Sequence, residues 1–134
     1  MAQVSRAQLT VASGMTPEQY IQSLVGGGIV ISNVTFSGNA NQIGTFDGVN
    51  STVGFNSGVV MAAGPITGLL GGPAPPNDPG TPGSGIADND LLAVAQSVNG
   101  GIFSTDDAAI LEFDFVPSSN LAAFNFVFSS DEYL

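Results

Sequence analysis

The sequence predicts an all-β protein: a jelly-roll-like antiparallel β-sandwich with two short helices, forming a single domain over residues 1–134. Apolar and polar residues alternate in the runs 110–116 and 121–128, and a period of two is typical of strands that bury one face. A third run, 29–38, is rich in β-branched and aromatic residues and also predicts a strand. Hydrophobic residues make up 43% of the chain, which is enough for a core.

The N-terminal part predicts a short strand followed by a helix. Residues 8–13, QLTVAS, alternate weakly, as a short strand does. Thr16 suits an N-cap, Pro17 suits the first helical position, and Gln19 completes a capping box. Glycines 26–28 end the helix. The apolar residues of this helix share one face: Tyr20, Ile21, Leu24 and Val25.

The middle of the chain predicts turns, a short strand and then a long loop. Residues 39–48 carry turn residues around Ile43 and Phe46, and 58–64 predict a short buried strand between glycines. Residues 64–88 hold six of the eight prolines, so we expect a long loop without regular structure.

The C-terminal part predicts a second helix and a hairpin. Residues 88–100 have the pattern of a short helix. The strands 110–116 and 121–128 are separated by Pro-Ser-Ser-Asn, a turn of hairpin length, and are expected to pair with each other. Burying the six large side chains on one face would contribute about 10 kcal/mol before entropy, so the hairpin needs a facing sheet. That face carries Leu111, Phe113, Phe115, Phe124, Phe126 and Phe128.

The charge balance excludes several classes of function. Eleven acidic residues face one basic residue, Arg6, and the formal net charge is −10. Such a chain cannot neutralise phosphates, which argues against nucleic-acid binding and against anionic lipid surfaces. It has no Cys and no His, and hence no thiol chemistry and no histidine base or zinc ligand. No apolar run approaches the roughly 20 residues of a membrane helix, so membrane insertion is not expected.

Four blocks in this order resemble the choice-of-anchor L domain: SNVTFSGNANQIGTF (32–46), GVVMAAG (58–64), TDDAAILEFDFVP (105–117) and FNFVFSSDEY (124–133). The resemblance implies a β-rich extracellular module of bacterial and some archaeal surface proteins, without an established enzymatic activity. It departs from the family pattern at Met61-Ala62-Ala63, where the family has Leu-Ser-Thr. The family continues beyond the acidic motif, so we expect that the C-terminal part is missing from this chain or supplied by another source.

Loop acids form a candidate Ca²⁺ site, because this ion takes six to eight oxygen ligands. The spacing of these acids is not that of an EF-hand loop. They also have a purely structural interpretation: Asp88 and Asp90 cap a helix, Asp106 makes a turn, and the terminal acids keep an edge soluble. The candidate ligands are Asp88, Asp90, Asp106, Asp107, Asp131 and Glu132.

A second acidic pair, Glu112 and Asp114, has the spacing of neighbours on one face of a strand. Two carboxyl groups at a defined gap are what glycoside hydrolysis uses. No nucleophile context or sugar platform accompanies them in the sequence, so the solvated outer face of a strand is favoured and no enzyme is expected.

Self-assembly is a more specific hypothesis than a metal site or an enzyme. A sheet ending on the Phe-rich strand 121–128 exposes a long apolar edge, which natural proteins seldom tolerate. Residues 3–13, within an N-terminal arm 1–14, are expected to donate a strand to a neighbouring subunit, which would build a filament or surface layer. The alternatives are that 3–13 pairs within its own subunit, and that the chain is a Ca²⁺-dependent adhesion module for a surface glycan or protein. The assembly residues are Gln8, Leu9, Val11, Phe124, Phe126 and Phe128.

Overall fold

The computed structural model describes residues 9–25, 28–70, 83–101 and 104–129, and its regular elements are mostly strands. The elements are, in chain order, β1 (Thr10–Ala12), α1 (Pro17–Val25), β2 (Val30–Ser37), β3 (Ile43–Asp47), β4 (Ser57–Met61), the 3₁₀ helix η1 (Ile66–Leu70), α2 (Asn89–Val98) and β5 (Ile110–Val116).

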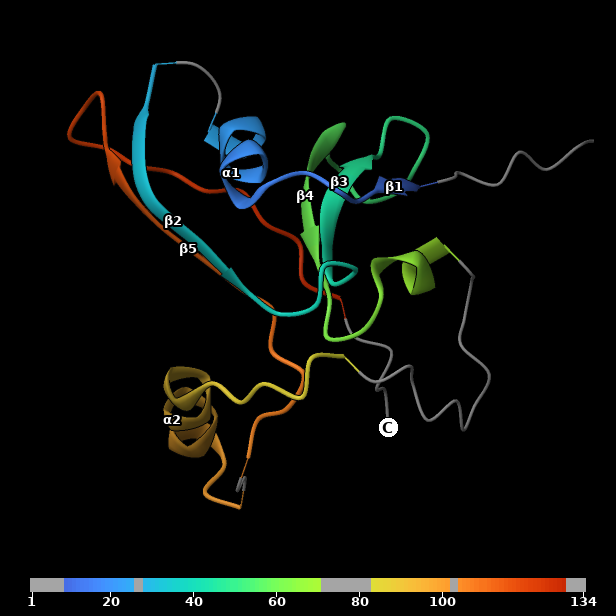
Figure 1. Cartoon of the computed structure of the whole chain (residues 1–134), viewed down its shortest axis with the longest axis vertical. Coiled ribbons are helices and arrows are strands. Elements are labelled where there is room, and N and C mark those ends of the chain that lie inside the picture. The colour runs from blue at the N-terminus through green and yellow to red at the C-terminus, as the bar shows by residue number, and fades with distance from the viewer. Residues whose placement is uncertain (1–8, 26–27, 71–82, 102–103, 130–134) are drawn as a thin grey trace, which may run out of the picture.

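The strands form two antiparallel sheets (Figure 1). One has the order β1-β3-β4 and the other pairs β2 with β5. The predicted class, antiparallel β with two short helices, is therefore confirmed. The jelly-roll connection stays a prediction, because the described strands do not display it.

Helix α1 lies between the two sheets and contacts both β2 and β4 (Figure 1). Its predicted start is confirmed as a capping box. The Thr16 backbone N–H donates to Gln19 Oε1 at 2.9 Å, and the Gln19 N–H donates back to Thr16 Oγ1 at 3.4 Å. Tyr20 and Ile21 are buried, whereas Leu24 on the same predicted face is exposed.

The core is small and gathers around α1 and β3. The buried hydrophobic residues among those described are Tyr20, Ile21, Ile43 and Ile66. The Tyr20 hydroxyl accepts hydrogen bonds from two backbone N–H groups of the loop before α1, at 3.1 and 3.2 Å. It lies 3.5 Å from the carbonyl of Ile43, to which it donates. Helix and sheet are thus joined by a polar contact inside the core.

Two local predictions in the middle of the chain are wrong. Residues 43–47, expected within a turn region, form β3, because this strand finds backbone partners on both sides, in β1 and in β4. The loop 64–88 is not wholly irregular either: η1 is anchored by buried Ile66, whose N–H donates to the carbonyl of Asn41 at 2.8 Å. Strand β4 is present as predicted, although it is half-buried rather than buried.

The predicted C-terminal hairpin is wrong. Residues 110–116 do form a strand, β5, but its partner is β2, with Ile31 opposite Phe115 and Phe36 opposite Leu111. Residues 121–129 have no strand or helix. The physical reason is that residues 118–120 form bends without a hydrogen-bonded turn, so the backbone of 121–128 is not returned into register beside β5.

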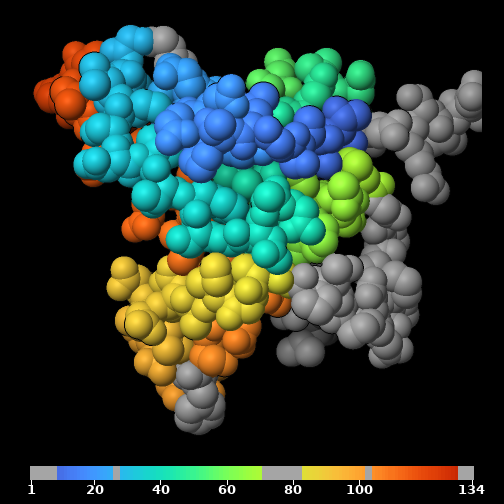
Figure 2. All heavy atoms as spheres, viewed as in Figure 1, coloured from blue at the N-terminus to red at the C-terminus, as the bar shows by residue number. Residues whose placement is uncertain are grey.

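Helix α2 is confirmed where the sequence predicted it, and Asp88 rather than Asp90 is its N-cap. The Asp88 carboxylate accepts a hydrogen bond from the Leu91 N–H at 2.8 Å. No residue of α2 is buried, and with its loops it forms a lobe of its own below the sheets (Figure 2). This lobe contributes no residue to the core.

Candidate functional site

Strands β2 and β5 together form a two-stranded ribbon with unlike faces. One face is apolar and half-buried, and includes Ile31, Phe36, Leu111 and Phe113. The opposite face is exposed and polar. It carries Ser32 and Thr35 from β2, and Glu112 and Asp114 from β5.

A β-bulge interrupts the ribbon at Asn33. The pairing shifts between Ser32 and Thr35, and Asn33 takes a left-handed conformation with φ of 51°. Its side-chain amide donates to Asp114 Oδ2 at 2.6 Å across the strands. The candidate pair Glu112 and Asp114 is thus exposed, and one carboxylate is bound to an amide. This arrangement matches the interpretation favoured by the sequence, in which the two acids lie on the solvated outer face of a strand.

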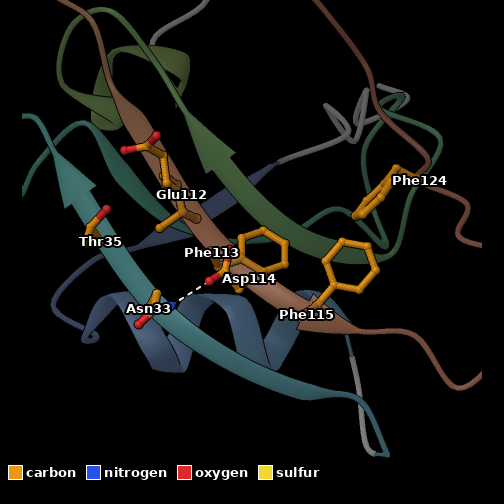
Figure 3. A pocket seen from close by; sticks show the side chains of 8 residues that line it. Asn33, Thr35, Glu112, Phe113, Asp114, Phe115 and Phe124 are labelled. Carbon is orange, nitrogen blue, oxygen red and sulfur yellow. Dashed lines mark hydrogen bonds between the residues drawn. The ribbon is translucent and has the colours of Figure 1, made fainter.

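Three phenylalanine rings cluster beside β5. The rings of Phe113 and Phe115 have centroids 5.9 Å apart, and Phe124 meets Phe115 edge-to-face at 6.2 Å and 82°. In Figure 3 these rings lie on the side of β5 away from β2. Phe124 comes from the irregular segment after the strand, and the contact brings that segment against β5.

A hollow of about 600 Å³ lies along β5 at this cluster (Figure 3). Polar and aromatic groups meet in its wall. Its lining residues are Asn33, Thr35, Leu111, Glu112, Phe113, Asp114, Phe115 and Phe124.

Residues 121–128, which we call the aromatic segment, are exposed throughout. Phe124 is 59% exposed, Phe126 82% and Phe128 84%. The segment contains no ionisable side chain, no proline and no glycine, in a chain whose net charge is −10. An uncharged, exposed run whose residues favour strands is typical of a surface that pairs with another chain.

The comparison with known proteins agrees with the sequence blocks. The family model described as the choice-of-anchor L domain matches residues 8–134. This chain belongs to that family. A choice-of-anchor domain is a cell-surface module, so the predicted surface location is supported at that level. Searches among curated proteins and among solved structures returned no match.

None of the helices that the structure describes in this choice-of-anchor L domain has both the length and the apolar character required to cross a bilayer.

Three of the acids proposed for Ca²⁺ accept hydrogen bonds from groups within or between their loops. Asp88 caps α2, Asp106 accepts a hydrogen bond from the Ser104 hydroxyl at 3.1 Å, and the Asp107 carboxylate accepts one from the Gly85 N–H at 2.7 Å. Asp90 is exposed in the first turn of α2. Within the described part of the chain no three acidic residues gather as a metal site. Asp131 and Glu132 lie outside the described residues.

The N-terminal residues predicted to take part in assembly lie partly inside and partly outside the described residues. Val11 lies in β1 and pairs opposite Phe46 of the same chain. Leu9 is half-buried, and Gln8 lies outside the described residues. In the single chain β1 thus follows the alternative in which the N-terminal stretch pairs within its own subunit, on the edge of the β1-β3-β4 sheet.

The choice-of-anchor L domain also contains a buried polar residue that sequence reasoning missed. Gln42 is fully buried, and its amide nitrogen lies within hydrogen-bond distance of the carbonyls of Ala62, Ala63 and Asp107, at 3.3, 2.7 and 2.9 Å. Its oxygen accepts from the Asn39 N–H at 2.7 Å. A single glutamine among turn residues carries no local signal of burial, so only its distant partners identify it.

Proposed function

We propose that this domain is a non-enzymatic structural module of the cell surface that self-associates through the aromatic segment, residues 121–128. The observation that supports this most is the exposure of Phe126 and Phe128, at 82% and 84%. Large apolar side chains that are contiguous and exposed mark interaction sites in soluble proteins. The chain therefore carries a surface that gains stability when a second surface covers it.

The size of this surface fits a specific interface. A phenylalanine buries about 150–250 Å² when it is covered, so the three exposed rings together with Leu121 and Val127 offer on the order of 700 Å² per copy. A standard protein interface buries roughly 800 Å² per partner. The aromatic segment is thus large enough to hold two copies together.

Charge is arranged to permit this contact. Two copies that each carry a net charge of −10 repel one another, but residues 117–129 contain no charged side chain. Because the aromatic segment has no carboxylate, it adds no charge repulsion of its own where it contacts the other copy. Because salt screens the remaining repulsion, self-association is expected to increase with ionic strength.

The test is the mass distribution of the purified chain by light scattering over a concentration series, at low and high salt, with electron microscopy of the same samples. We expect concentration-dependent assemblies that the double variant Phe126→Ser/Phe128→Ser abolishes. The matched control is Val94→Ser/Val98→Ser, which removes exposed apolar side chains from α2 and should leave assembly intact. A monodisperse monomer under all conditions would overturn the proposal.

Ca²⁺-dependent adhesion is the second candidate, with one observation in its favour. The loops 83–88 and 104–108 lie side by side, joined by a hydrogen bond from the Gly85 N–H to Asp107 and by bonds between Asp88 and Thr105. Both loops carry acidic residues. A melting temperature that rises with CaCl₂ and falls back with chelator would favour this function, and unchanged melting would oppose it.

A further inference from the structure

The hollow beside β5 follows the strand along its length. Five consecutive residues, 111–115, all line it. The lining also includes Asn33 and Thr35 of β2, so the hollow reaches across the polar face of the ribbon as well as along β5. Its volume is about 600 Å³. Residues 111–115 are therefore open to a second molecule along the whole strand.

Strand β5 has a free edge at this position. Among the described strands it pairs with β2 alone, so the edge away from β2, which we call the outer edge, has no strand beside it. The rings of Phe113 and Phe115 lie on that side (Figure 3). An unpaired edge with apolar side chains next to it is the arrangement that accepts an added strand in β-augmentation.

The contact between Phe115 and Phe124 indicates the register of such an added strand. These rings already meet edge-to-face at 6.2 Å. In an antiparallel pair, each step back along one strand is a step forward along the other. With Phe124 opposite Phe115, Phe126 comes opposite Phe113, and the aromatic rings of both strands share one face.

The same register is electrostatically acceptable on the other face. Asn125 comes opposite Asp114, and Val127 comes opposite Glu112. No acid of the added strand faces an acid of β5, whereas like charges directly opposite would destabilise the pair. The aromatic segment lies outside the described strands. Its phenylalanines stand at every second position, and it carries no charge.

The segment of the same chain contacts Phe115 through Phe124, but it forms no strand pairing with β5. After residues 117–120 it diverges from the line of β5 (Figure 1). Phe126 and Phe128 remain 82% and 84% exposed. The outer edge of β5 thus stays open while a matching segment stays uncovered, and both are present on every copy.

We propose that the outer edge of β5 accepts the aromatic segment of a second copy as an antiparallel strand, in the register that places Phe124 opposite Phe115. This inference rests on the proposed function, because it names the acceptor for the self-association described above. Reciprocal exchange between two copies closes a dimer, and one-way donation continues into a filament.

Disulfide trapping tests the register directly, because the chain contains no cysteine. Residues directly opposite in an antiparallel pair have Cβ atoms about 4.5–5.5 Å apart, near the range that a disulfide bridges. One preparation carries Asp114→Cys and the other Asn125→Cys, and the two are mixed and oxidised. A second pair, Glu112→Cys with Val127→Cys, uses positions that do not disturb the Asn33–Asp114 hydrogen bond.

We expect disulfide-linked heterodimers from both opposed pairs, in several-fold excess over a control mixture of Asn125→Cys with Thr67→Cys on η1. If the copies associate but the opposed pairs do not cross-link above this control, the acceptor is wrong and the proposed function stands. If no association occurs by light scattering, the proposed function fails as well.

A double variant, Glu112→Cys/Val127→Cys in one chain, lies beyond the contact of Phe115 with Phe124 and separates exchange from closure within a copy. Under dilute oxidation the proposal expects the chains to remain free thiols. A monomeric disulfide would show that the segment folds back onto its own β5, which would overturn exchange between copies. Far-ultraviolet circular dichroism of each variant confirms that the strands are retained.

Discussion

The side-chain amide of Gln42 donates a hydrogen bond of 2.9 Å to the backbone carbonyl of Asp107, a residue 65 positions away in the chain. The same nitrogen lies 2.7 Å from the carbonyl of Ala63. One buried side chain therefore ties the entry of β3 to the segments that follow β4 and precede β5. Asp107 itself has a left-handed conformation, with φ of 59°.

Replacement of this glutamine is expected to destabilise the domain strongly. In Gln42→Ala the carbonyls of Ala63 and Asp107 lose the buried amide that donates to them, which costs about 1–3 kcal/mol of the free energy of unfolding. Urea denaturation followed by circular dichroism measures the change. The control Asn125→Ala removes an exposed amide and should alter the free energy by less than about 0.5 kcal/mol. Equal stability of Gln42→Ala and wild type would contradict the role assigned to this residue.

The hydroxyl of Tyr20 is expected to stabilise the junction between α1 and its preceding loop. It accepts hydrogen bonds from the N–H groups of Gly14 and Met15 at 3.1 and 3.2 Å, and it is in a buried side chain. Tyr20→Phe keeps the ring but leaves these donors without their acceptor, at a cost of about 1–2 kcal/mol. Tyr20→Ala also opens a cavity and should cost about 3–5 kcal/mol. Two variants of equal stability would refute the separate contribution of the hydroxyl.

Gly44 is expected to tolerate no side chain. It is buried in β3, and an added Cβ would overlap Ile66 Cδ1 and the backbone oxygen of Ala12. Gly44→Ala therefore forces β1 or η1 to move, and we expect a loss of about 1–3 kcal/mol. Gly68→Ala is the matched control, since nothing lies within 4 Å of its added Cβ. Thermal melting of the two variants should differ clearly, and coincident curves would argue against the close packing of η1 on β3.

Glu18 provides a pH-dependent contribution to the start of α1. Its pKa lies below the ordinary value of 4.5, because a backbone N–H and the Thr16 side chain donate hydrogen bonds to the carboxylate. A carboxyl group whose pKa is lower in the folded chain stabilises the fold above its unfolded pKa. This stabilisation is lost as the pH falls through the folded pKa.

The corresponding comparison is wild type against Glu18→Gln in urea over a pH series. We expect wild type to be slightly more stable at neutral pH, and the difference to disappear on acidification below 4.5. A difference that is independent of pH would show that the carboxylate's charge plays no part at the helix start.

The sequence by itself determined the elements whose signals are local. The capping box of Thr16 and Gln19, the Asp88 cap and the alternation of 110–116 all depend on residues within a few positions of one another, and each produced the predicted element. Such signals act through hydrogen bonds between residues close in sequence and through the periodicity of side chains. Family membership followed from blocks of residues in a fixed order.

The tertiary structure decided which partner each segment meets. Strand β5 pairs with β2 instead of the nearby aromatic segment, and residues 43–47 form a strand because β1 and β4 flank them. Gln42 is buried among carbonyls that approach from the segments after β4 and before β5. These choices depend on matching faces and chain closure across tens of residues, which no local pattern encodes.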